Sequence, residues 1–146
     1  MRRFEQLDTF SLDEKSGLVT ISANHPDATT ITLKREGLYV VISISYGPFE
    51  IGMRPRAQEL GRVLARLTPV EGLNTTRQIG TGQAYLAVGL KPDGTLLMRP
   101  TIVADASGYM TFNLSIASDA RKALYEWLPA VADTGTGPLP PLPENS

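Results

Sequence analysis

The side chains that most often carry catalysis are sparse in this chain. The one histidine, His25, lies two residues before Asp27, a spacing that allows a His–Asp contact. Such a contact supports catalysis only beside a nucleophile, and the chain has no cysteine and no G-x-S-x-G elbow. The acidic pair Asp13 and Glu14 falls in a predicted turn, where both carboxylates are solvated. The sequence therefore predicts no catalytic site, no metal site and no cofactor.

Two closely spaced glycines resemble part of a phosphate-binding loop. Such a loop opens a helix and continues into Lys-Ser or Lys-Thr. Here Gly80-Thr81-Gly82 precedes a predicted strand, and neither pair follows it. We interpret the segment as a turn or bulge, and we expect a binding protein rather than an enzyme.

The residues best suited to binding are aromatic and basic. Tyrosines alternate with small residues on predicted strands, as Tyr39 does with Ser43 and Ser45. Such a face stacks unpaired bases on its rings, while cationic side chains at strand ends contact phosphates. The predicted nucleic-acid contacts are Lys34, Tyr39, Arg54, Arg56, Arg77, Tyr85, Lys91, Arg99 and Tyr109. A purely structural explanation stays open, because tyrosine and threonine favour any half-exposed strand and lysines keep sheets soluble.

These residues need sheets to position them, and the pattern predicts strands along most of the chain. Alternating apolar residues are separated by turns rich in glycine, proline and aspartate. The expected strands are 2–12, 18–23, 29–34, 38–46, 49–53, 75–79, 83–90, 95–104 and 109–116. Two further stretches, 57–67 and 119–128, have apolar residues at helical spacing. They are predicted to be helices that pack on the sheets.

Alternation along the strands separates core positions from outward positions. In 38–46 the even positions from 40 to 44 are aliphatic and are expected in the core. In 83–90, Leu86 and Val88 are expected in the core, while Tyr85, Ala87 and Gly89 are expected on an open outer face. The outer faces are therefore predicted to be small, wettable and accessible.

The chain contains an approximate internal repeat. Gly37 and Gly108 each open a similar alternating stretch, and a predicted helix follows in each half. We predict one α+β domain, residues 1–131, made of two imperfect repeats (about 1–70 and 71–131) of antiparallel strands followed by a packed helix. Convergent strand patterning stays open as an explanation of the similarity. The Gly- and Pro-rich residues 132–146 are predicted to be a flexible tail.

Composition and charge limit the partners. The chain has 146 residues, 42% of them hydrophobic and 20% charged, which suits one folded domain. Its net charge of −1 provides no global basic field for a polyanion. Residues 51–99 carry seven basic and three acidic side chains, a local charge of +4, so a polyanion site would be local. With no secretory leader and no apolar run of roughly 20 residues, we expect a cytoplasmic protein without membrane contact.

Strands followed by a packed helix, repeated once in a chain of this length, resemble the Whirly-type single-stranded-DNA-binding fold and its half-sized transcriptional-coactivator relatives. The resemblance is one of pattern and covers about residues 2–129. Those proteins bind melted DNA along sheet surfaces and associate through their helices, which implies a homo-oligomer here. The Lys-Gly-Lys-Ala-Ala signature of plant Whirly proteins is absent. The nearest stretch, Thr81-Gly-Gln-Ala-Tyr-Leu86, has glutamine where a lysine would stand.

Three functions follow from these patterns. The first is a non-enzymatic protein that binds single-stranded DNA or RNA in transcription or DNA maintenance. The second is a protein-interaction module, or a small regulator that docks on a larger complex such as RNA polymerase. The third, a small-molecule-binding β-barrel, fits less well because the inward positions are apolar and no polar cluster converges among them.

Overall fold

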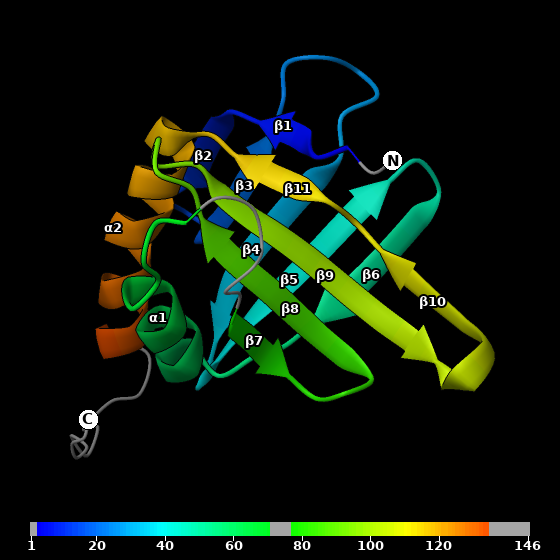
Figure 1. The fold of residues 1–146 in the computed structure, drawn as a ribbon. Coiled ribbons are helices and arrows are strands. Elements are labelled where there is room, and N and C mark those ends of the chain that lie inside the picture. Colours follow the sequence, from blue (N-terminus) through cyan, green and yellow to red (C-terminus); the bar gives the residue numbers. More distant parts are fainter. Residues whose placement is uncertain (1–2, 71–76, 135–146) are drawn as a thin grey trace.

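Two β-sheets packed face to face and two helices make up the computed structural model, which describes residues 3–70 and 77–134 (Figure 1). The helices lie together at one side of the sandwich. The strands are β1 (Glu5–Leu7), β2 (Thr9–Asp13), β3 (Leu18–Ser22), β4 (Thr30–Glu36), β5 (Tyr39–Tyr46), β6 (Phe49–Met53), β7 (Arg77–Gly80), β8 (Ala84–Leu90), β9 (Leu96–Ala104), β10 (Gly108–Thr111) and β11 (Leu114–Ile116). The helices are α1 (Ala57–Ala65), α2 (Ser118–Thr134) and the short 3-10 turn η1 (Asp105–Ser107).

The first half of the chain folds into a five-stranded antiparallel meander, β2-β3-β4-β5-β6. Short turns join its strands, and Gly37 has a φ of 63° at the β4–β5 hairpin, a conformation that glycine adopts without steric cost. The register pairs Leu33 with Ile42 and Thr32 with Ser43. Apolar side chains therefore share the inner face and hydroxyl side chains the outer face.

The strands of the second half, together with β1 from the N-terminal end, form a six-stranded sheet in the order β1-β11-β9-β8-β7, with β10 also paired to β9. All of its pairings are antiparallel except that of β1 with β11, which is parallel. The prediction of an α+β fold is confirmed: two sheets, antiparallel apart from the β1–β11 pair, pack with two helices.

The prediction of a single strand over residues 2–12 is wrong. This stretch divides at Asp8, with β1 in the six-stranded sheet and β2 in the five-stranded sheet. The Asp8 N–H donates to the Ser22 carbonyl (3.0 Å), while the fully buried Leu7 stays in register with Ile116. The chain crosses between the sheets here because its two ends pair with different partners.

One hydrophobic core joins both sheets and both helices. Leu60 and Leu64 of α1 and Leu124 and Leu128 of α2 are buried in it. The Tyr125 hydroxyl donates to the Leu64 carbonyl (3.0 Å) and ties the helices to each other. Burial raises the pKa of Tyr125, so this phenol stays a neutral hydrogen-bond donor at neutral pH.

The closing helix is longer than predicted. It continues past Pro129 to Thr134, six residues beyond the expected end at Leu128. Proline costs the helix one backbone hydrogen bond, but the apolar stripe of α2 packs on the core and holds the preceding turns. Residues 132–134 of the predicted tail are therefore helical, and the rest of the tail, 135–146, lies outside the described residues.

The outer face of the six-stranded sheet is only partly open. Ala87 and Leu97 are 6% and 4% exposed, and Gly89 is buried as well. The prediction that Ala87 and Gly89 lie on an open face is therefore wrong. The chain after α1 returns along this end of the sheet, where the Val70 N–H donates to the Leu90 carbonyl (2.8 Å). The accessible part of the face lies at the other end of β8 and β9.

Candidate functional site

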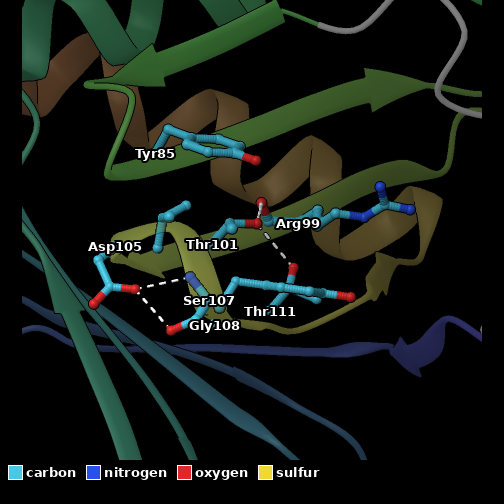
Figure 2. Close-up of a pocket in the computed structure, with 9 residues that line it drawn as sticks. Tyr85, Arg99, Thr101, Asp105, Ser107, Gly108 and Thr111 are labelled. Atoms are coloured by element: carbon cyan, nitrogen blue, oxygen red, sulfur yellow. Dashed lines mark hydrogen bonds between the residues drawn. The ribbon is translucent and has the colours of Figure 1, made fainter.

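A hollow of about 490 Å³ opens on the outer face of the six-stranded sheet, where β8, β9 and β10 meet the η1 turn (Figure 2). It combines aromatic, hydroxyl, basic and acidic side chains. Its lining is Tyr85, Arg99, Thr101, Val103, Asp105, Ser107, Gly108, Tyr109 and Thr111.

The floor of the hollow is a pair of threonines on adjacent strands. Thr101 of β9 and Thr111 of β10 are direct cross-strand partners, so their side chains point to the same face. Their hydroxyl oxygens are 2.8 Å apart and share a hydrogen bond. Thr111 also lies 3.1 Å from the Pro100 carbonyl, and Thr101 lies 3.3 Å from the Arg99 carbonyl. One hydroxyl thus donates to the other, which donates in turn to a backbone carbonyl, and both are fixed.

Two tyrosines come from the strands on either side of β9. Tyr85 of β8 pairs with Thr101, and Tyr109 of β10 pairs with Val103. Two strand spacings, about 10 Å, separate the backbones of β8 and β10. Tyr109 is 62% exposed, and Tyr85 is half-buried. The two rings therefore come from opposite sides of the threonine floor.

Arg99 lies at one end of the hollow and points along the sheet (Figure 2). Its Nε–H donates to Asn113 Oδ1 (2.8 Å), and its guanidinium lies 5.8 Å from the centre of the Phe4 ring. These contacts hold the guanidinium plane. In the part of the chain that the structure describes, its terminal NH2 groups have no hydrogen-bond acceptor.

Asp105 lies at the opposite end, in the turn that joins β9 to β10 (Figure 2). It has a φ of 53°, a left-handed conformation that aspartate tolerates better than most residues. Its Oδ1 accepts from the Ser107 N–H (2.8 Å) and the Ser107 hydroxyl (2.9 Å). These bonds lower the pKa of Asp105, so the carboxylate is ionised at neutral pH.

The structure brings together three of the nine predicted contacts: Tyr85, Arg99 and Tyr109 all line this hollow. A second group forms on the other sheet, where the guanidinium carbons of Arg54 and Arg56 lie 5.1 and 5.7 Å from the Tyr39 ring centre. The two sheets pack through their inner faces, so Tyr39 lies on the outer face opposite the hollow. Arg54 lies at the edge between the sheets, where it lines a separate hollow with Gly80 and Ala84.

The remaining predicted contacts lie apart from the hollow. Lys34 is exposed on the outer face of the five-stranded sheet, where it pairs with Val41. Lys91 follows the far end of β8, roughly 20 Å along the strand from Tyr85. Arg77 pairs with Val88 in β7, and its side chain lies outside the described part of the structure.

The roles of Phe4, Thr101 and Asp105 do not follow from the sequence alone. Phe4 reaches Arg99 through the pairing of β1 with β11, which no local pattern signals. Thr101 is recognisable as a floor residue only once β9 is known to pair with β10. The Asp105–Gly108 stretch was recognised as a turn, but its place beside the tyrosines depends on strand order.

Other kinds of site are not evident in residues 3–70 and 77–134. Their His, Asp and Glu side chains do not gather in groups of three that could hold a metal ion. Neither α1 nor α2, as far as they are described, has the length and apolar character needed to cross a bilayer. No protein-family model, curated protein or solved structure matches this chain.

Proposed function

We propose that this chain is a non-enzymatic, cytoplasmic protein that binds single-stranded DNA or RNA through the hollow on its six-stranded sheet. The observation that carries the proposal is the convergence of Tyr85, Tyr109 and Arg99 on one accessible hollow. The tyrosines supply planar surfaces for unpaired bases. Arg99 supplies a fixed fork of N–H donors that suits a phosphate.

The energetic balance favours stacking over charge. The described lining contains one cation, Arg99, and one anion, Asp105, so it has no net positive charge. Each base stacked on an aromatic ring contributes about 1–3 kcal/mol. Two tyrosines therefore provide most of the affinity, and the dependence on salt should be shallow for a nucleic-acid-binding protein. A duplex keeps its bases stacked internally and should bind more weakly.

The wider proposal follows the pattern-level resemblance to Whirly-type proteins. Under it the chain acts in transcription or DNA maintenance and associates with copies of itself. Its basis is the succession of β2 to β6 and then α1, and of β7 to β11 and then α2, along the chain. The choice between DNA and RNA is part of what must be measured.

The test is fluorescence anisotropy of a labelled strand of about 30 nucleotides, titrated beside a duplex of the same sequence. We expect the single strand to bind more tightly than the duplex. The Tyr85→Ala, Tyr109→Ala double variant should raise the dissociation constant at least about tenfold, since each lost stack costs about 1–3 kcal/mol.

Tyr39→Ala is the matched control, because Tyr39 belongs to the group on the opposite face. It should leave the dissociation constant within about twofold of the unmodified protein. If Tyr39→Ala weakens binding and the double variant does not, the site lies on the five-stranded sheet and the assignment to the hollow is wrong.

A specific feature supports a second candidate, the protein-interaction module. Tyr46 and Phe49 are cross-strand partners at the tip of the β5–β6 hairpin, and both are exposed. Exposed aromatic pairs are common in protein interfaces. This function predicts no binding of either oligonucleotide in the same titration, and loss of a protein partner when both aromatics are changed to serine.

A further inference from the structure

The floor of the hollow can accept hydrogen bonds from a ligand but has no proton left to donate to one. A threonine hydroxyl has one proton to donate and two lone pairs that accept. One of the two protons lies in the hydrogen bond between Thr101 and Thr111. If Thr101 donates that proton, Thr111 can donate its own to the Pro100 carbonyl. If Thr111 donates it, Thr101 can donate its own to the Arg99 carbonyl. Both protons are therefore used inside the protein, whichever hydroxyl donates. What the floor can offer a ligand is lone pairs.

The Asp105 end of the hollow has the same character. Its carboxylate is ionised and can only accept hydrogen bonds. Oδ1 receives both bonds from Ser107. Within the described residues, Oδ2 receives no hydrogen bond, so it is available to a donor on a ligand. The donor groups of Arg99 lie at the other end.

We propose that the hollow holds one base and selects bases that carry an exocyclic amine, such as cytosine, over thymine and uracil. This inference rests on the proposed function, because it assumes that a base enters the hollow. The amine would donate to Oδ2 of Asp105 or to the threonine oxygens. A carbonyl in the place of the amine would face the oxygens of Asp105 and the threonines, which cannot donate to it. A desolvated carbonyl without a donor weakens binding.

Cytosine and thymine make the cleanest comparison. Both are pyrimidines with a carbonyl at position 2, so a bond from that carbonyl to Arg99 would not distinguish them. At position 4 cytosine has an amine and thymine has a carbonyl, and at position 5 thymine alone has a methyl group. At N3 thymine has one N–H donor and cytosine has none, so the cytosine amine offers the acceptors two N–H donors against the single one of thymine. A tyrosine hydroxyl can donate or accept, so Tyr85 favours neither base.

The experiment compares oligo-dC and oligo-dT strands of 15 nucleotides, at equal salt and neutral pH, by anisotropy titration. The two strands have equal length, charge and number of binding registers. The unmodified protein should bind oligo-dC about three- to tenfold more tightly, the range expected for one net hydrogen bond. Thr111→Val, which removes one floor hydroxyl, should reduce this ratio.

Asp105→Asn is the decisive variant. Asparagine tolerates a positive φ and can keep the bonds to Ser107 through its carbonyl oxygen, so the turn should persist. Its amide adds a donor, which should bring the dC:dT ratio to about one or below. Asp93→Asn is the control, because Asp93 is another turn aspartate that accepts from a backbone N–H two residues on (Thr95, 2.9 Å), at the distant β8–β9 hairpin.

Each outcome decides one of the two claims. A dC preference that Asp105→Asn abolishes and Asp93→Asn keeps supports the base assignment. Equal binding of both strands, a dT preference, or a dC preference that Asp105→Asn leaves intact overturns the assignment and leaves the proposed function standing. Failure of both strands, and of oligo-rC and oligo-rU of the same length, to bind overturns the proposed function, and the inference with it.

Discussion

Arg99 supplies the basic side chain of the hollow, and its neighbours fix its direction. The bond to Asn113 and the contact with Phe4 reduce the side-chain entropy that an arginine loses when it binds a phosphate. A guanidinium fixed in this way makes a well-defined electrostatic contribution to the binding of a phosphate. The described lining of the hollow contains one such group, so its electrostatic role can be measured by itself.

Arg99→Gln should make the salt dependence of single-strand binding shallower. Each phosphate contact to a single strand contributes about −0.7 to the slope of log K against log salt concentration. Loss of one contact should therefore change the slope by about 0.7, as measured by titration between low and moderate salt. Lys34→Gln, on the opposite face, is the control. An unchanged slope in Arg99→Gln would show that Arg99 does not contact phosphate.

Glu5 of β1, in the six-stranded sheet, is hydrogen-bonded to Thr29, the residue before β4 of the five-stranded sheet. Its carboxylate accepts from the Thr29 N–H (2.9 Å) and from the Thr29 hydroxyl, and Thr29 is 2% exposed. Glu5→Ala would leave the buried Thr29 groups without their acceptor, which costs about 1–3 kcal/mol. Urea unfolding should show this loss, whereas Glu14→Ala, at an exposed turn position, should unfold at nearly the wild-type midpoint. Equal midpoints for the two variants would contradict this role.

At the scale of elements, the β7–β8 hairpin places Tyr85 beside the floor. Gly80 ends β7 with a φ of 121° and pairs with Tyr85. A Cβ added at Gly80 would lie 2.4 Å from the Ala84 carbonyl oxygen, whereas one at Gly82 would have no neighbour within 4 Å. The glycine pair that resembled a phosphate loop is thus a turn, as expected, and its first glycine is required by the backbone.

Gly80→Ala should destabilise the protein by at least about 2 kcal/mol, because it combines an unfavourable φ with a backbone clash. Gly82→Ala, which meets neither problem, should change the free energy of unfolding by less than about 1 kcal/mol. Thermal or urea unfolding of the two variants makes the comparison. A similar stability for both would show that the hairpin adopts another conformation.

The sequence predicted those elements that local signals specify. The turn at Lys91–Gly94 and the glycine at position 37 predicted their hairpins correctly, and alternation placed Val40, Ile42 and Ile44 in the core. The pairing of β1 with β11 could not be predicted, because Glu5 and Leu114 are far apart in sequence and no turn chemistry joins them.

In the hollow too, local signals predicted the direction of side chains, whereas strand order was needed to show which of them lie together. Alternation placed Tyr85 and Tyr109 on outer faces, but only strand order shows that both flank β9 while Tyr39 belongs to the other sheet. Arg99 was expected at or near a strand end, and it lies within β9 opposite Asn113. The predicted list of nine contacts was therefore a mixture of two surfaces.

At the scale of the whole molecule, the two sheets present different outer faces. The six-stranded sheet carries the hollow, and the five-stranded sheet carries the Tyr39 group. The helices present a third surface, an apolar hollow of about 320 Å³ between α1 and α2 that Leu64, Tyr125 and Leu128 help to line. This surface is where a second copy would be expected to bind, given the resemblance to proteins that associate through their helices.

The predicted homo-oligomer is tested by sedimentation velocity. The mass should be two or more times the 15.8 kDa of one chain. Ala65→Glu places a charge on an exposed position of the helix surface and should shift the protein toward the monomer without unfolding it. A mass of one chain at every concentration would contradict the prediction, and it would leave the nucleic-acid proposal untouched because all described groups of the hollow lie in one chain.

The most direct test of the central claim is an amide NMR titration of the labelled protein with a single strand of 15 nucleotides. Chemical-shift changes should be confined to the hollow, at the amides of Tyr85, Thr101, Ser107 and Thr111 and their neighbours. Amides on the outer face of the five-stranded sheet should not move. Shifts centred on Tyr39, or on the surface between α1 and α2, would contradict the assignment of nucleic-acid binding to the six-stranded sheet.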